Sequence, residues 1–136
     1  HLMQLFRQVY QFANFCGVTP VQAALAEFMQ QHPEHIQGLS AFYQEKRDLF
    51  NSGLQDSRFI FTPSQGTYFQ NLDYSAIRPD LDDVAMCQWL AHQHGIVAIP
   101  ISVFYQHPPQ DLRLIRFCFA KQDQTLAQAA KILTNC

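Results

Sequence analysis

LRLIRFCFA, residues 112–120, is an apolar run with the chemistry of a buried β-strand, and a charged side chain, Arg116, lies in its middle. The two-residue period of a strand places Ile115, Phe117 and Phe119 on one face and Leu114, Arg116 and Cys118 on the other. A guanidinium that projects from such a strand is costly unless an anion pairs with it. The partner of Arg116 is therefore expected to be an internal Asp or Glu, or the carboxylate or phosphate of a ligand. An edge-strand arginine in water is the remaining alternative.

Composition predicts a single compact core and excludes several classes of function. The chain has 136 residues, of which 48% are hydrophobic and 13% aromatic, enough to bury one core. The formal charge of −2 and the scattered lysines and arginines argue against a nucleic-acid partner. No apolar stretch approaches membrane-spanning length, so no membrane interaction is expected.

The cysteines and histidines predict neither a disulfide framework nor a metal site. Cys16, Cys87, Cys118 and Cys136 form no CxxC pair, a pattern typical of reduced thiols in the cytoplasm. The close histidine pairs, 32 with 35 and 92 with 94, lack the spacing of zinc ligands.

The first third of the chain has helical periodicity. Residues 2–12 read as the end of a helix, and residues 12–18 as an irregular connection. Thr19 is expected to cap the next helix, with Pro20 in its first turn. After Pro33 a further helix should run to about Asn51 and end at Ser52-Gly53. Its predicted apolar face consists of Ile36, Leu39, Tyr43 and Phe50.

The rest of the chain alternates short strands and helices. Residues 58–61 and 67–72 are expected to pair as antiparallel strands around the turn at 63–66. A helix should begin within residues 79–83 and close at Gly95, followed by a strand at 96–99, a loop at 100–111 and the strand at 112–120. The predicted buried residues are Val84, Cys87, Leu90 and Ala91 on this helix and Leu126, Ala129, Ala130 and Leu133 on the last one. The fold class is α+β, a small and mainly antiparallel sheet flanked by helices.

Three segments, in this order and spacing, carry a resemblance to a known family. They are GTYF at 66–69, IPISVFY at 99–105 and RFCFAK at 116–121. The set resembles the C-terminal part of class I/II aminotransferases, the pyridoxal-phosphate enzymes of fold type I, and most of all the methionine and kynurenine aminotransferase branch. Residues 19–22 and 42–48 also match, so the resemblance covers nearly the whole chain.

The resemblance implies that this chain is a fragment of a longer enzyme. Residues 1–18 would be the end of the large domain and a linker, and residues 19–136 the small C-terminal domain. The large domain would supply the cofactor lysine, and none of Lys46, Lys121 and Lys131 falls at such a position. The opening within a helix, without methionine, agrees with truncation. The parent is expected to be a cytoplasmic homodimer that binds pyridoxal phosphate, whereas the fragment should bind none, be inactive, and self-associate through exposed apolar surface.

The resemblance also assigns candidate site residues, all of them substrate-binding. Arg116 would bind the α-carboxylate of the amino-acid or 2-oxo-acid substrate. Phe104 and Tyr105 would approach an apolar or aromatic substrate side chain, with loop packing as the alternative. Tyr68, close after Gly66, would lie near a ligand, with a place in the core as the alternative. No catalytic, cofactor-binding or metal-binding residue is expected in this chain.

The sequence departs from the family at two positions that bear on the subunit contact. Val18 stands where relatives often have Asn, and Tyr10 where they often have His. Two other functions stay open on sequence grounds. The chain could be a freestanding module that uses Arg116 to grip a free carboxylate or a partner's acidic side chain, or a purely structural interaction domain.

Overall fold

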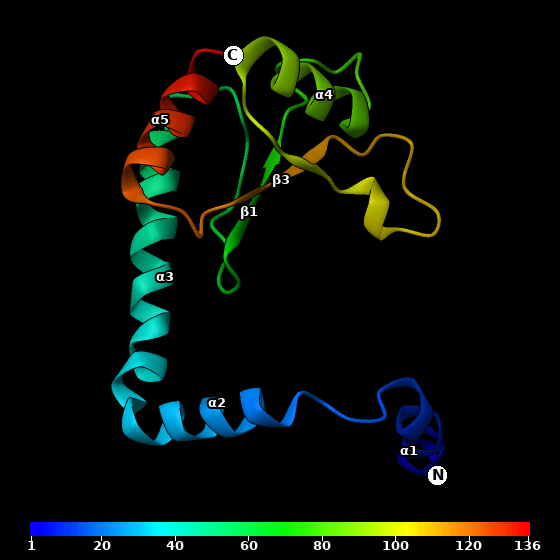
Figure 1. Ribbon diagram of the computed structural model, residues 1–136. Coiled ribbons are helices and arrows are strands. Elements are labelled where there is room, and N and C mark those ends of the chain that lie inside the picture. Colours follow the sequence, from blue (N-terminus) through cyan, green and yellow to red (C-terminus); the bar gives the residue numbers. More distant parts are fainter. The chain divides into compact units, whose positions relative to one another are not determined.

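The computed structural model describes residues 1–136, which form two compact units, His1–Leu39 and Ser40–Cys136. The helices are α1 (Leu2–Ala13), α2 (Thr19–Gln31), α3 (Pro33–Gly53), α4 (Asp83–Trp89), which continues as a π-helical turn (Leu90–His94), and α5 (Asp123–Thr134). The strands are β1 (Phe69–Asp73), β2 (Ile99–Pro100) and β3 (Leu114–Cys118), and a 3-10 turn spans Ser102–Phe104 (Figure 1). None of the helices has the length and apolar character needed to cross a membrane.

The first unit contains α1, α2 and the beginning of α3. Helix α2 starts at Thr19 itself, after Val18 in an extended conformation, and no side chain caps its amides. The prediction that Thr19 is the cap was therefore wrong by one position, because the Val18 carbonyl already accepts the first helical hydrogen bond, from Gln22 N at 3.1 Å. Pro20 lies in the first turn, as predicted.

The second unit is built on a three-stranded antiparallel sheet in the order β1-β3-β2. The predicted faces of the central strand β3 are confirmed, because Ile115, Phe117 and Phe119 are buried whereas Leu114, Arg116 and Cys118 are not. The buried face packs on the helices: the ring of Phe117 lies 6.1 Å from that of Phe50 on α3. The α+β architecture predicted from the sequence is confirmed.

Helix α5 lies beside the C-terminal part of α3 (Figure 1). Thr134 Oγ1 donates to the Gly53 carbonyl at 3.1 Å, and Lys46 Nζ pairs with Asp123 at 2.6 Å. The expected buried face of α5 is confirmed at Leu126, Ala130 and Leu133, with Ala129 half-buried. On α3 the expected apolar face is only partly buried: Phe50 lies in the core, but Ile36 is exposed.

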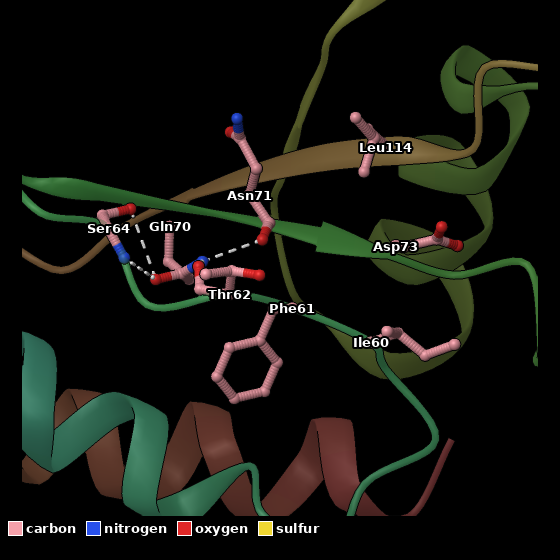
Figure 2. Close-up of a pocket in the computed structure, with 8 residues that line it drawn as sticks. All are labelled: Ile60, Phe61, Thr62, Ser64, Gln70, Asn71, Asp73 and Leu114. Carbon is pink, nitrogen blue, oxygen red and sulfur yellow. Dashed lines mark hydrogen bonds between the residues drawn. The ribbon is translucent and has the colours of Figure 1, made fainter.

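The predicted hairpin between residues 58–61 and 67–72 is reduced to a single bridge. Only Ile60 pairs with a strand residue, Asp73, and β1 begins at Phe69. The residues after this bridge are bonded to Gln70, whose buried side chain donates to the Thr62 carbonyl and accepts from Ser64 N, 2.9 and 3.0 Å away (Figure 2). A side chain thus satisfies backbone groups that a strand ladder would otherwise pair.

Helix α4 begins within the predicted residues 79–83, but part of its buried face differs from the prediction. It starts at Asp83, with Asp82 as a cap whose carboxylate accepts from Ala85 N at 2.7 Å, and Gly95 ends the following turn at φ 68° as expected. The buried positions are Asp83, Met86 and Leu90, with Cys87 half-buried. Val84 and Ala91 are exposed, contrary to prediction, because the Asp83 carboxylate turns inward to bind Ser102 N.

Strand β2 is shorter than the predicted strand and lies later in the sequence. Only Ile99 and Pro100 pair with β3, whereas the strand was predicted at 96–99. Ile96 and Ala98 are nevertheless buried in the core. The predicted loop 100–111 contains the 3-10 turn at Ser102–Phe104, which places Phe104 beside β3.

Candidate functional site

Arg116 lies at the centre of the sheet. Its Cα is the cross-strand partner of Asn71 on β1 and of Ile99 on β2. The side chain is half-buried on the face opposite to the hydrophobic core. None of the four ion pairs of the structure involves Arg116, and its guanidinium makes no hydrogen bond within the chain. The internal ion pair that the sequence left open is therefore not formed.

Two aromatic rings contact the guanidinium instead. Arg116 Cζ lies 4.6 Å from the ring centroid of Phe69, at the start of β1, and 4.5 Å from that of Phe104 in the 3-10 turn. Such contacts stabilise the cation by about 0.5–1 kcal/mol each where solvent is near. They restrict the guanidinium but leave its N–H groups without acceptors. The arrangement is suited to binding a planar anion through a two-pronged hydrogen-bonded pair.

A cavity of about 360 Å³ adjoins Arg116. Its wall is mainly apolar and includes the core residues Phe50, Phe117 and Leu126, so most of the cavity lies on the core side of the sheet, with Arg116 and Lys121 as its two cationic residues. Neither Phe69 nor Phe104 lines this cavity, so it is not the space in front of the guanidinium that these two rings flank.

A second cavity, of about 390 Å³, lies between residues 60–64 and β1 (Figure 2). Figure 2 shows the side chains of Asn71 and Leu114 on one side of the sheet and that of Gln70 on the other. Asn71 therefore shares the face of Arg116 and adds an exposed carboxamide to it. Gln70 is committed to its own hydrogen bonds, so its role is to hold residues 62–64 in place.

The predicted site residues do not all gather around Arg116. Phe104 contacts it, whereas Tyr105 only closes the 3-10 turn, donating from its backbone N to the Ser102 carbonyl at 3.0 Å. The ring of Tyr68 lies 6.3 Å from that of Tyr43 on α3, and neither tyrosine forms a cation–π contact with Arg116. Their roles at a substrate stay predictions.

Sequence reasoning missed Phe69 and Asn71 as neighbours of Arg116. The strand period could have found both, because positions 69, 71 and 73 of β1 share one face once the register with β3 is known. That register depends on which residues of 67–72 begin the strand, and the sequence pattern alone does not settle this.

Buried ionisable groups near α4 offer no reactive nucleophile at neutral pH. Burial, reinforced by the charge of Asp83, raises the pKa of the Cys87 thiol to about 12. Burial also raises the pKa of Tyr74 to about 12, and its hydroxyl donates to the Leu81 carbonyl at 3.1 Å. Both groups stay protonated and neutral in the physiological range.

The three lysines of this chain differ in their contacts. Lys46 Nζ pairs with Asp123 at 2.6 Å, whereas Lys121 and Lys131 are exposed and form no ion pair. The chain also has no cluster of three or more His, Cys, Asp or Glu side chains that could hold a metal ion.

Comparison with known proteins assigns the family. The model of the family "Aminotransferase class I and II" matches residues 2–133. The chain is 47% identical over 127 residues to the methionine aminotransferase of Escherichia coli strain K12, covering 93% of this chain and 32% of that protein. It is 32% identical over 145 residues to human kynurenine–oxoglutarate transaminase 1, covering 93% of this chain and 34% of that protein.

Solved structures agree with the sequence comparison. The crystal structure of an E. coli protein with a methionine aminotransferase function matches with a TM-score of 0.86 and 46% identity, covering 96% of this chain and 34% of the other. The N-succinyldiaminopimelate aminotransferase of Mycobacterium tuberculosis matches with a TM-score of 0.78 and 30% identity, covering 92% of this chain and 32% of the other. The chain thus spans about a third of the length of these relatives, and its helices and sheet match their small C-terminal domain. The chain belongs to the class I and II aminotransferase family.

Proposed function

We propose that this chain is the substrate-carboxylate-binding part of a pyridoxal-phosphate-dependent aminotransferase. The complete enzyme would transfer the amino group of methionine, an aromatic amino acid or kynurenine to a 2-oxo acid. Arg116 would bind the α-carboxylate that the amino-acid donor and the 2-oxo-acid acceptor share. The observation that carries the proposal is the guanidinium of Arg116, flanked by Phe69 and Phe104 and without an acidic partner in its own chain.

The contribution of Arg116 would be orientation. A carboxylate held at two points cannot rotate freely, so the Cα–H bond of the substrate keeps one direction relative to the rest of the site. Pyridoxal phosphate, when bound to the complete enzyme, supplies the electron sink for the chemistry at that bond. An apolar donor agrees with the aromatic rings of Phe69 and Phe104 that flank the guanidinium.

The remaining parts of the enzyme would come from outside this chain. We place the end of the large domain and its linker at residues 1–18 and the small domain at 19–136. The large domain would carry the cofactor lysine, and a second copy of the enzyme would complete a cytoplasmic homodimer. The 136-residue chain alone would then be inactive and bind no cofactor.

The test is spectroscopic and uses the complete polypeptide that contains this chain. With added pyridoxal phosphate it should acquire the visible absorbance band of a lysine-bound cofactor, and methionine should bleach the band while an added 2-oxo acid restores it. The 136-residue chain, treated in the same way, should show no protein-bound band. Absence of the band from the complete polypeptide, with saturable binding of carboxylic acids by calorimetry, would instead favour a freestanding binding module.

A further inference from the structure

We infer that Asp83 is a positioning residue for the carboxylate site. It acts by fixing the 3-10 turn that holds Phe104 against Arg116. The inference rests on the proposed function, since it concerns how the same anion site is kept in shape. It assigns a role to a buried charge that neither the sequence pattern nor the contacts of the core explain.

The first step is the unusual position of the Asp83 carboxylate. Its residue is only 3% exposed, although aspartate is rarely fully buried without a partner. No lysine or arginine forms an ion pair with it. The bond that this carboxylate makes is to the backbone, because Asp83 Oδ2 accepts from Ser102 N at 2.6 Å. Its location in the first turn of α4 favours the negative charge through the helix dipole.

The second step is the place that this bond secures. Ser102 is the first residue of the 3-10 turn, and Phe104 is the last. Inside the turn, Phe104 N donates to the Ile101 carbonyl at 3.1 Å and Tyr105 N to the Ser102 carbonyl at 3.0 Å. Phe104 itself is 58% exposed, whereas Ile101, just before the turn, is 9% exposed and Pro100 pairs with β3. The Asp83 carboxylate adds a charge-assisted bond at Ser102 that fixes the start of the turn to α4.

The third step connects the turn to Arg116. The Phe104 ring centroid lies 4.5 Å from Arg116 Cζ, so a shift of the turn moves one of the two rings that restrict the guanidinium. Neighbouring polar groups cannot replace Asp83 in this role. Tyr74 donates its hydroxyl to the Leu81 carbonyl, and the adjacent Asp82 is occupied with the amide of Ala85.

The test compares four substitutions in the complete aminotransferase polypeptide. Two variants, Asp83→Ala and Asp83→Leu, remove the carboxylate that accepts from Ser102 N, and the leucine keeps a side chain of similar branching. Asp83→Asn keeps a carbonyl oxygen that can accept from Ser102 N. Asp82→Ala is the matched control, because it removes a neighbouring carboxylate and a helix cap from the same helix without touching the 3-10 turn.

The first readout is hydrogen exchange of the peptide that covers residues 102–105, which does not depend on catalytic activity. Exchange should rise on the order of tenfold in Asp83→Ala and Asp83→Leu, and stay close to that of the unaltered protein in Asp83→Asn and Asp82→Ala. If Asp83→Ala and Asp83→Leu both fold and residues 102–105 exchange at the rate of the unaltered protein, the inference is overturned. This outcome does not depend on whether the protein transaminates.

The second readout is kinetic and separates positioning from general stability. Asp83→Ala should raise KM for the amino acid on the order of tenfold with a smaller change in kcat, and Asp83→Asn should restore most of it. In a Phe104→Ala background the Asp83→Ala effect on KM should largely vanish, because both changes remove the same ring from Arg116. Additive effects would contradict the inference. An inactive unaltered protein would refute the proposed function alone, and the exchange data would still decide the role of Asp83.

Discussion

Replacing Arg116 by Ala should separate a large loss of substrate binding from a small loss of stability. A charge-assisted hydrogen bond contributes about 1.5–3 kcal/mol, so losing both prongs should lower kcat/KM of the complete enzyme on the order of a hundredfold or more. The unfolding free energy should fall far less. Within its own chain Arg116 loses only the contacts with Phe69 and Phe104, together about 1–2 kcal/mol, whereas breaking a buried ion pair would cost about 3–5 kcal/mol.

Arg113 on the same stretch provides the matched control. Its guanidinium donates to the carbonyls of Pro79, Gln110 and Leu112 at 3.1, 3.3 and 3.0 Å, so it is a structural arginine. Arg113→Ala should therefore cost about 2 kcal/mol of stability or more and leave KM nearly unchanged. Arg116→Lys should recover stability but little activity, because a point charge cannot copy the fork of a guanidinium.

Two assays decide whether Arg116 binds substrate or stabilises the fold. Steady-state kinetics of the complete enzyme with methionine give kcat/KM, and urea unfolding of the 136-residue chain, followed by the fluorescence of its single tryptophan, gives stability. If Arg116→Ala keeps normal amino-acid kinetics, or destabilises the chain more than Arg113→Ala does, then Arg116 has a structural role and the carboxylate site is wrongly assigned.

Three further predictions concern packing and titration. A Cβ added at Gly53 would lie 2.6 Å from Ala130 Cβ, so Gly53→Ala should lower the unfolding free energy, measured by urea denaturation, by about 1–3 kcal/mol. The control is Gly38→Ala on the same helix, where the added Cβ meets open space and the change should be neutral or stabilising. Folding raises the pKa of Tyr74 from 10.0 to about 12, so the unfolded chain releases this proton at lower pH than the folded chain, and the unfolding free energy should fall as pH rises from about 10 towards 12. Unfolding measured at a series of pH values should show a smaller decline in Tyr74→Phe. An equal decline in both proteins would contradict the prediction. Iodoacetamide at pH 8 should modify the exposed Cys118 well before Cys87, because burial raises the pKa of the Cys87 thiol to about 12. Peptide mass spectrometry measures the two rates, and equal rates would contradict the burial of Cys87.

The elements that the sequence predicted best are those with a strong period. The two faces of β3 and the buried face of α5 followed from alternation and from helical spacing, since each repeats one pattern over several residues. Gly95 was found as a helix end because a left-handed residue at that place strongly favours glycine.

Two of the departures from prediction involve a polar side chain that bonds to the backbone of another segment. Gln70 bonds to residues 62 and 64 beside the shortened strand pairing, and Asp83 bonds to Ser102 and is buried on α4 in place of the predicted Val84. Neither residue was among the predicted buried residues. Local patterns cannot show that a glutamine or an aspartate will be buried, because the partner lies in another segment of the chain.

The sequence predicted the positive charge of Arg116 at the candidate site but not the two aromatic rings around it. The sequence indicated that Arg116 needs an anion, yet an internal acid would have satisfied that requirement and occupied the donors that a substrate would use. Aromatic rings solve the problem differently, because they offset part of the cost of partial burial and have no strong acceptor for the N–H groups. An arginine between phenylalanines is thus restricted in position and still able to bind a carboxylate. That combination, more than the presence of an arginine in a strand, distinguishes a site for an exchanging substrate from a permanent ion pair.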